Sequence, residues 1–433
     1  DKLLGEALFP LIKHYGCFEG EIILKKNSIY FLLLLSLNIL SVGEVFVFND
    51  YKNPARIINF PNTEKYQVVV ADLHTHSVFS DGAVWPNVRV EEAVRDGIDI
   101  MAVTEHLEYQ PHIDDIPHPD RNRSFEIAEE ISQNKDLVVI NGAEITRMFP
   151  PGHINAVFIE DANKLIYLDE SKIEEAKQDL EKIPEEDLQE YKNQSWLEDA
   201  ALANLWPVKE ALKEARKQKA FTFWNHPAWS SEEFIGEPMV RDVHKDFFES
   251  ELLHGIEVAN GDGYSEEAFQ IALDYGLTIL GTSDVHGLID WDYPPAIGAH
   301  RPVTLILAKN RSNDAVKSAL FAGKTVVWYK NNLIGLQENV TELTNAYLKA
   351  RKVEILSKSD IAKIAIENVS DVKFIAQVLN ETSLINETSL IEIAPNTTTF
   401  IQVDGGADMD SMDLQILNAF IGPKKNLKTT IIF

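Results

Sequence analysis

The sequence predicts an α/β fold with a mostly parallel sheet, followed by a small domain built from β-strands. From residue 67 to residue 329, short β-branched runs alternate with amphipathic helical segments. The number of these units favours a closed barrel, and an open doubly wound sheet is the alternative. After Tyr329 the helical pattern stops, and short apolar runs separated by turn residues predict a β-sandwich.

In the first region each predicted element follows from its local pattern. Val68, Val69 and Val70 form a β-branched run that is typical of a buried strand, and Pro86 suits the first turn of a helix. Strands are predicted at 68–70, 98–103, 137–140, 153–159, 220–224, 256–259, 277–280, 303–307 and 325–328. Helices are predicted at 86–96, 125–132, 206–217, 266–275 and 315–321.

Residues 160–205 interrupt this alternation. They are rich in Glu, Asp and Lys, which predicts an exposed helical insertion, either a lid over a site or a solvated helix without a role. In the C-terminal region, strands are predicted at 353–356, 363–367, 373–377, 390–394, 398–403, 414–417 and 429–433. The chain therefore divides into an N-terminal extension (1–49), an α/β domain (50–335) and a β-sandwich-like domain (336–433).

The N-terminal extension has the pattern of an export signal. Lys25 and Lys26 precede the apolar run 29–40, and small residues follow at 41–43. The run is short for a transmembrane helix, and a buried core helix is the alternative. We expect cleavage near residues 43–50 and a periplasmic or secreted protein. Such cleavage removes Cys17, the only cysteine, so the mature chain would have neither a disulfide nor a catalytic thiol.

The composition limits the classes of partner. The 433 residues carry a formal net charge of −28, and 45% of them are hydrophobic, as in a folded globular protein. The acidic charge repels nucleic acid and anionic lipid, and the sequence contains no long basic run. We therefore expect a small-molecule substrate, no nucleic-acid partner and no stable membrane span, while the oligomeric state is left open.

The segment ADLHTHSVFSDG, residues 71–82, follows the first predicted strand. Because side chains on a strand alternate in direction, His74 and His76 point the same way and Thr75 points the other way. A Ser-Asp-Gly turn then allows Asp81 to fold back toward the strand end. Two imidazoles on one face suit a single metal ion, and a pair of surface histidines is the alternative.

Similar polar residues follow the other predicted strands. They are Asp72, Glu105, His106, Glu144, His153, Asn155, Asn225, His226, Glu257, Asn260, Asp284 and His286. The carboxyl ends of parallel strands gather at one mouth of a barrel, so these residues together indicate a metal site. The histidines without such a context are His14, His112, His118, His244, His254 and His300. Of these, His112 and His118 are candidates for the rim of the site.

Together these motifs resemble those of the PHP superfamily, which is named for polymerase and histidinol phosphatase domains. The matching pieces are His74-x-His76, Asp81, Thr-Glu-His106, Gly-Ala-Glu144, Gly-His153, Asn-His226-Pro and Ser-Asp284-x-His286. The resemblance runs from about residue 68 to residue 330. It implies a distorted seven-stranded (β/α) barrel that binds two or three divalent metal ions, Zn, Mn or Fe.

Carried over by position, the resemblance implies three groups of metal ligands. The first group is His74, His76, Glu144 and Asp284. The second is Glu144, His153 and His226, with Glu144 bridging, and the third is Asp81, His106 and His286. The family often has His at the position of Asp81. An anionic oxygen ligand there favours Mn or Fe over Zn, or a weakly filled third site.

The resemblance also implies hydrolysis of a small phosphodiester or phosphomonoester by a hydroxide that bridges two metals. Asp284 and Glu144 would take part in catalysis by holding those metals. Arg147 would grip a phosphate oxygen in bidentate fashion, and a salt bridge is its alternative role. The candidates for contact with the substrate are Asn225, Asn260, Tyr264 and Trp291.

Other functions are weighed against this one. A nuclease of the same superfamily is disfavoured by the acidic charge and by the lack of a basic groove. A metal-stabilised scaffold, whose β-domain binds a ligand or glycan, is disfavoured because the ligand set looks complete. A histidinol phosphatase is chemically feasible, but the export signal and the extra domain argue against that biosynthetic role.

Overall fold

The structure is a computed structural model that describes residues 57–112, 115–116, 118–147, 149–166, 206–228, 237–356, 359–385 and 388–433. The following description concerns the compact unit Pro54–Phe433. The predicted export signal lies outside the described residues. The same holds for residues 167–205 of the insertion predicted at 160–205.

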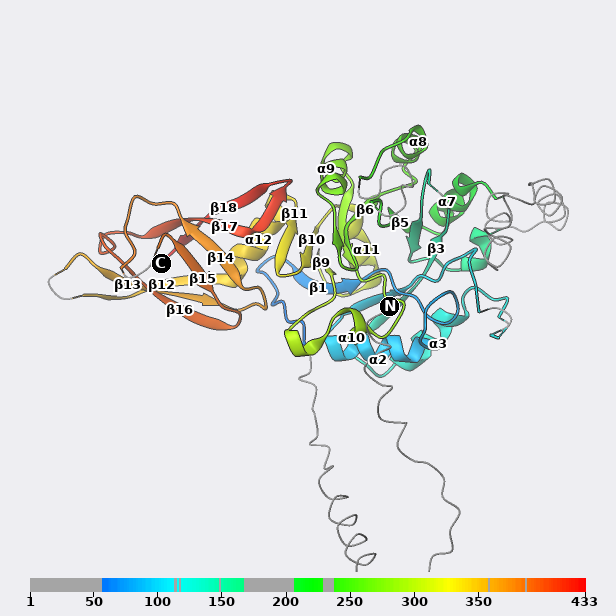
Figure 1. Cartoon of the computed structure of the whole chain (residues 1–433), viewed down its shortest axis with the longest axis horizontal. Coiled ribbons are helices and arrows are strands. Elements are labelled where there is room, and N and C mark those ends of the chain that lie inside the picture. Colours follow the sequence, from blue (N-terminus) through cyan, green and yellow to red (C-terminus); the bar gives the residue numbers. More distant parts are fainter. Residues whose placement is uncertain are drawn as a thin grey trace, which may run out of the picture. The chain divides into compact units, whose positions relative to one another are not determined.

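The first part of this unit alternates strands and helices, as predicted (Figure 1). Its strands are β1 Gln67–Asp72, β2 Ile100–Val103, β3 Val138–Ile145, β4 Ile154–Val157, β5 Phe221–Trp224, β6 Gly255–Asn260, β7 Gly263–Tyr264, β8 Thr278–Thr282, β9 Val303–Ala308 and β10 Thr325–Tyr329. Its helices are α2 Pro86–Asp96, α3 Arg123–Ser132, α7 Val208–Lys217, α8 Asp242–Glu249, α9 Glu266–Tyr275, α10 Ile289–Asp292 and α11 Asn313–Phe321. The described residues of this part also contain two 3₁₀ turns, η1 Ala162–Leu165 and η2 Pro295–Ile297, and α8 is a helix that was not predicted from the sequence.

The sheet is mixed and not mostly parallel, contrary to the prediction, because antiparallel pairs outnumber parallel pairs among the described strands β1–β10. Strands β1, β2 and β3 are parallel, β4 is antiparallel to both of its neighbours, and β5, β6 and β8 are parallel again. Strand β9 pairs antiparallel with β1 and with β10. The predicted α/β class is confirmed, whereas the seven-stranded barrel stays a prediction.

Threonine side chains join β8 to β9 and β10. Thr304 Oγ1 donates to the Gly281 carbonyl at 2.8 Å and accepts from the Gly281 amide at 3.0 Å. Thr325 Oγ1 donates to the Ile279 carbonyl at 2.7 Å. Glycine permits this approach, because a Cβ at residue 281 would lie 2.3 Å from a methyl carbon of Val327. These hydrogen bonds place β8 beside β9 and β10.

The uninterrupted apolar run of β1 is explained by burial of both faces of the strand. Val68 and Val70 belong to one hydrophobic cluster, while Val69 and Ala71 belong to another. A strand that is covered on both faces reads as a continuous apolar run, whereas a half-exposed strand alternates.

Helix α2 begins and ends where the sequence predicts. Pro86 occupies its first turn, where no intrahelical N–H bond is lost. Gly97 ends it in the left-handed conformation (φ 79°), and its amide donates to the carbonyls of Ala93 and Val94. This end returns the chain directly into β2.

The helical pattern does not stop at Tyr329, contrary to the prediction. Helix α12 (Gln337–Tyr347) buries Val340, Leu343 and Tyr347, which recur at helical spacing on one face. The strands of this region are β11 Asn332–Gly335, β12 Leu348–Ile355, β13 Ala362–Asn368, β14 Phe374–Val378, β15 Leu390–Ile393, β16 Thr397–Val403, β17 Ser411–Gly422 and β18 Lys425–Ile432.

The strands from β12 onward form two layers around one core. Strands β12, β13 and β16 make a separate three-stranded sheet, and β14, β15, β17 and β18 belong to the large sheet. Ile364 and Ile401 of the first layer share a hydrophobic cluster with Phe374 and Leu414 of the second. Strand β11 pairs parallel with β17, so the same sheet continues into the α/β region. This two-layered packing is that of the predicted β-sandwich.

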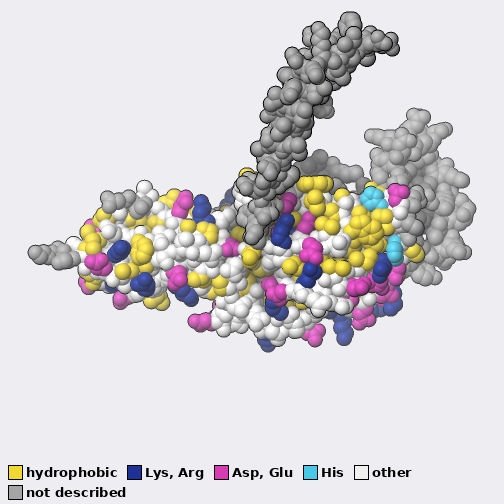
Figure 2. Space-filling view, turned by 90° about the horizontal axis from the view of Figure 1, so that it is seen from below, with side chains coloured by type: hydrophobic (Ala, Val, Ile, Leu, Met, Phe, Trp, Pro, Cys, Tyr) yellow, Lys and Arg dark blue, Asp and Glu magenta, His cyan; other side chains and the backbone are white. Residues whose placement is uncertain are grey.

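The described surface agrees with the expected charge pattern on the face seen in Figure 2. There, Lys and Arg side chains lie among Asp and Glu and do not gather into a basic patch. Within the described ranges, no helix combines the length and the apolar character needed to span a bilayer.

His244 of α8 is a buried histidine that the hydrogen bonds hold in its neutral form. Its Nδ1 accepts from the Arg241 amide at 3.0 Å, and its Nε2 donates to the Pro151 carbonyl at 2.8 Å. The ring stacks on Trp224 with centroids 4.1 Å apart. Burial lowers the pKa of His244 to about 4.

We expect His244 to make the folded protein less stable as the pH falls from 6.5 toward 4. In this interval His244 of the unfolded chain, with an ordinary pKa of 6.5, binds a proton, whereas His244 of the folded protein does not. The full difference corresponds to about 3 kcal/mol. Urea denaturation with chelator present, at pH 7 and at pH 5, measures the free energy of unfolding. This free energy should change less between the two pH values in His244→Phe than in the unaltered protein. An unchanged pH dependence in the variant would contradict this assignment.

Candidate metal centre

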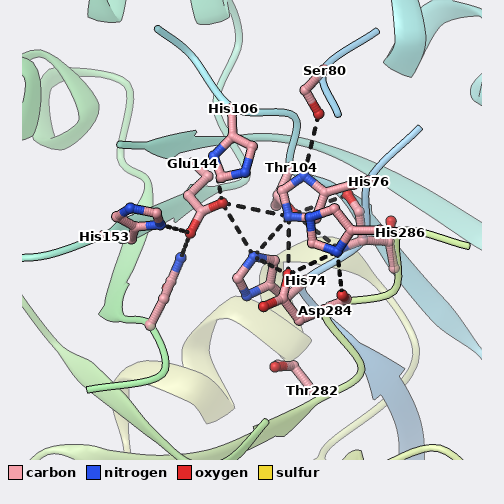
Figure 3. Close-up of polar contacts among 12 residues, drawn as sticks. His74, His76, Ser80, Thr104, His106, Glu144, His153, Thr282, Asp284 and His286 are labelled. Atoms are coloured by element: carbon pink, nitrogen blue, oxygen red, sulfur yellow. Dashed lines mark hydrogen bonds and ion pairs between the residues drawn. The ribbon is translucent and has the colours of Figure 1, made fainter. Parts of the chain in front are cut away.

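The two histidines that follow β1 point the same way, as predicted. The backbone of Thr75, between them, forms a parallel bridge with Val285, and the Thr75 hydroxyl donates to the Ala102 carbonyl at 2.7 Å. The Nε2 atoms of His74 and His76 lie 3.0 Å apart, and Figure 3 shows both rings turned toward Glu144 and Asp284. The strand alternation read from the sequence is thus confirmed.

Two imidazole nitrogens, Nε2 of His74 and Nε2 of His76, lie close to two carboxylate oxygens, Oδ1 of Asp284 and Oε2 of Glu144. Both ring nitrogens are 3.1 Å from Asp284 Oδ1 and 3.4 Å from Glu144 Oε2. Ligand atoms bound at about 2.0–2.1 Å in a tetrahedron lie roughly 3.3 Å from one another. The separations among His74, His76 and Asp284 therefore fit three ligands of one cation, and Glu144 Oε2 lies close to both imidazoles.

Glu144 extends the cluster in a second direction through its other oxygen. Its Oε1 lies 3.0 Å from His153 Nδ1 and 3.3 Å from His226 Nε2, and His106 Nδ1 is 2.9 Å from Oε2. The residue is fully buried, and Oε2 accepts no hydrogen bond although imidazole nitrogens surround it. An ionised carboxylate oxygen in that position is suited to a cation.

Asp81 gathers the third predicted group. Its Oδ1 lies 3.2 Å from His286 Nε2, and its Oδ2 lies 3.4 Å from His106 Nε2. The ring of His76 stacks on that of His286 with centroids 4.3 Å apart, so His76 joins this group as well. The structure therefore brings all nine predicted ligands into one cluster, but they form four groups: His74, His76 and Asp284; His74, Glu144 and His226; His106, Glu144 and His153; and His76, Asp81, His106 and His286.

The electrostatic environment keeps the carboxylates of the cluster ionised. Burial acts to raise the pKa of Glu144, but the charges of His106 and His74 hold it well below its usual range. The pKa of Asp284 is likewise lowered, against the effect of burial, chiefly by His74. Burial and the nearby His286 lower the pKa of His76 to about 3. The neutral ring of His76 thus keeps a lone pair for a metal.

Glu257 of β6, one of the polar residues predicted to gather at the strand ends, supports the cluster from behind and is not among the predicted ligands. Its Oε1 lies 2.8 Å from His74 Nδ1 and accepts from Thr282 Oγ1 at 2.6 Å. Its Oε2 accepts from the His226 amide at 2.6 Å and from Asn260 Nδ2 at 2.9 Å. The contact with His74 holds the proton on Nδ1 and turns the Nε2 lone pair toward the cluster. A lone carboxylate within an apolar strand was the available signal in the sequence.

Glu105, beside the ligand His106, anchors the loop that carries Asp81. Its buried carboxylate accepts from the Ser77 amide at 3.0 Å and from the hydroxyls of Ser77 and Ser80. The Thr-Glu-His motif therefore supplies both a candidate ligand and a support for the loop.

Arg147 does not face the site, contrary to the prediction that it grips a phosphate. Its Nη1 pairs with Glu108 and donates to the Thr146 carbonyl at 2.8 Å, and its Nη2 donates to the Trp206 carbonyl at 2.9 Å. Only 6% of the residue is exposed. The salt bridge weighed as its alternative role is the arrangement in the structure.

Asn225 also takes a supporting position where contact with a substrate was predicted. It is completely buried, and its Nδ2 donates to Glu144 Oε1 at 2.7 Å and to Asn155 Oδ1 at 2.9 Å. These bonds fix the orientation of the Glu144 carboxylate. The position after β5 was identified correctly, but the direction of the side chain depends on Asn155 of the neighbouring strand.

A pocket of about 550 Å³ opens over the cluster. Its described lining consists of Asp81, His106, Glu144, His153, His226, Pro227, Ala228, Glu257, Val258, Asn260, Gly263, Tyr264, Ser265, Asp284 and His286. Of the remaining predicted contacts, Asn260 and Tyr264 line it. Trp291, which is 67% exposed, is not among the residues that line it, and neither are His112 and His118.

The comparison with solved structures decides the family. A two-domain protein from Bacteroides vulgatus, which contains a predicted PHP-like metal-dependent phosphoesterase, is 33% identical to this chain with a TM-score of 0.73. The match covers 87% of this chain and 98% of the other. This chain belongs to the PHP-like metal-dependent phosphoesterase family. A family model described as an Ig-like domain matches residues 348–432, so this PHP-like protein also carries an Ig-like domain.

More distant structures add only a weak likeness. A putative metal-dependent phosphoesterase from Bifidobacterium adolescentis is 18% identical, with a TM-score of 0.35 and coverage of 58% of this chain and 96% of that one. An amidohydrolase from Chromobacterium violaceum is 18% identical, with a TM-score of 0.34 and coverage of 51% and 88%. A comparison with curated proteins found no match. The Bacteroides relative and the cluster of metal ligands together support a metal-dependent hydrolase.

Proposed function

We propose that this PHP-like protein hydrolyses a small phosphoester with the aid of two or three divalent metal ions. The observation that carries the proposal is the set of 3.0–3.4 Å separations among His74, His76, Glu144 and Asp284. Two imidazole nitrogens and two carboxylate oxygens this close together suit a divalent cation.

The remaining ligand groups support more than one metal. His106 and His153 gather around Glu144, and His286 and His106 gather around Asp81. Imidazole and carboxylate ligands in this mixture accept Zn, Mn or Fe. Such ions, when bound, activate water and neutralise the oxygens of a phosphoryl group.

The protein's own residues supply position and shape for this chemistry. Glu144 offers one oxygen to each side of the cluster, and Asn225 holds that carboxylate in place. Glu257 orients His74, and Glu105 holds the loop that presents Asp81. Ligands held this rigidly keep the metals and the phosphoryl group in a single arrangement, which favours the reaction.

The pocket beyond the cluster indicates the kind of ester. Val258, Pro227 and Ala228 are apolar residues in the pocket lining, and none of the described residues that line the pocket is Lys or Arg. The metals would therefore supply the positive charge for the phosphate. We infer a substrate with one phosphoryl group, a monoester or a diester, whose uncharged organic part lies against these apolar residues.

Metal content and hydrolysis measured on one sample test the proposal. The purified protein would be stripped with chelator, reloaded with Zn or Mn, and analysed for metal by mass spectrometry. Hydrolysis of p-nitrophenyl phosphate and bis-p-nitrophenyl phosphate should rise with metal content and show which ester is preferred. Bound metal without hydrolysis of either ester would favour the scaffold alternative. Absence of metal after reloading would contradict the site itself.

A further inference from the structure

Arg89 of α2 is a buried arginine that contacts two segments bearing metal ligands. Its Nε donates to the His76 carbonyl at 2.7 Å. Its Nη2 donates to the His286 carbonyl at 2.8 Å and also to the Gly287 carbonyl. Only 2% of the residue is exposed, and it belongs to none of the motifs that indicate the metal site. One side chain thus joins the segment after β1 to the segment after β8.

Glu92, one turn along the same helix, completes this contact. Arg89 Nη1 donates to Glu92 Oε2, and Glu92 Oε1 accepts from the Ile289 amide at 2.9 Å. The pair therefore binds both carbonyl and amide groups of residues 286–289. Glu92 also balances the charge of the buried Arg89 guanidinium, because an unpaired buried charge would destabilise the fold.

Other contacts hold the first ligand group together without Arg89. The Asp284 amide donates to the His74 carbonyl at 2.9 Å, and the His76 amide donates to the Val285 carbonyl at 3.1 Å. Beyond Val285, the described contacts to the His286 carbonyl come from the Ala83 amide and from Arg89. The position of His286 therefore depends more strongly on Arg89 than the position of Asp284 does.

We propose that Arg89, with Glu92, is a positioning residue that sets the spacing of His76 and His286 and thereby the metal affinity of the third ligand group. The stacked rings of His76 and His286 lie 4.3 Å apart and share that group with Asp81 and His106. The inference rests on the metal binding proposed above. It adds a residue that is not itself one of the predicted metal ligands.

An arginine is required because all three guanidinium nitrogens are in use. Nε contacts the first segment, Nη2 contacts the second, and Nη1 pairs with Glu92. The planar fork presents these donors in fixed directions. A lysine keeps the charge but has a single nitrogen, so it cannot span both segments in this way.

The test is a metal titration of the chelator-treated protein, by calorimetry with Mn or Zn, together with mass spectrometry of the bound metal. Arg89→Lys should lower the affinity for the most weakly bound ion about tenfold to a hundredfold, as loss of an outer support of ligands does. The tighter ions should bind as before. Arg311→Met, which removes a partly exposed arginine paired with Asp99 and Asp136, is the control and should bind every ion normally.

Circular dichroism and thermal unfolding show whether the variants fold. A second variant combines Arg89→Met with Glu92→Gln and so removes both charges. If this double variant does not fold, Arg89→Lys alone serves as the test. Wild-type affinity for every ion in folded Arg89→Lys would overturn the inference, and so would an equal weakening of all ions. If the unaltered protein binds no metal, both proposals are wrong. If it binds metal but hydrolyses no ester, only the proposed function is wrong.

Discussion

Glu144→Gln is expected to remove most of the bound metal and to lower the rate of hydrolysis about a thousandfold. Glu144 is the residue that contacts both sides of the cluster, with Oε2 near His74 and His76 and Oε1 near His153 and His226. The amide keeps the size of the side chain but removes its charge and turns a donor toward the imidazoles. Metals supply several kcal/mol of transition-state stabilisation, and about 4 kcal/mol corresponds to a thousandfold change in rate.

Metal analysis and initial rates with the preferred p-nitrophenyl ester are the measurements. Glu130→Gln, on the exposed face of α3, makes the same chemical change away from the cluster and should leave both quantities unchanged. Wild-type metal content in Glu144→Gln would show that the carboxylate is not a ligand. Wild-type hydrolysis with reduced metal content would separate the reaction from the metals and contradict the proposed function.

Arg147→Met is expected to destabilise the fold by about 3–5 kcal/mol, because it leaves the buried carboxylate of Glu108 without its partner. The side chains of this pair are only 5% and 3% exposed, so water cannot replace the lost contact. The Michaelis constant should change little, since the guanidinium donates to Thr146 and Trp206 carbonyls and is absent from the pocket lining. We therefore expect a large loss of folding stability and only a small change in the Michaelis constant.

Urea denaturation and steady-state kinetics distinguish the two roles of Arg147. Arg123→Met is the control, because it breaks an exposed pair with Glu126 that is worth less than about 1 kcal/mol. Combining Arg147→Met with Glu108→Leu should restore part of the lost stability by removing the unpaired charge. A Michaelis constant raised tenfold with unchanged stability would instead support a contact with phosphate.

The sequence by itself determined the α/β class, the β-sandwich strands and the set of residues that cluster as candidate metal ligands. These features are local: apolar runs mark buried strands, and polar residues directly after a strand lie at its end. His74 and His76 could be placed on one side of the chain because strand geometry alternates. The resemblance to a family then joined pieces such as Glu144 and Asp284, which no local rule connects.

Only the tertiary structure decided the roles of the residues around that cluster. Asn225 and Arg147 follow strands as predicted, yet they turn toward Glu144 and Glu108 because those partners lie on other elements. Glu257 and Arg89 gained roles for the same reason, since their contacts join segments far apart in the chain. The direction of β4 and the presence of α12 also depend on packing against neighbours. A side chain's position along an element is a local property, but its partner is set by the whole fold.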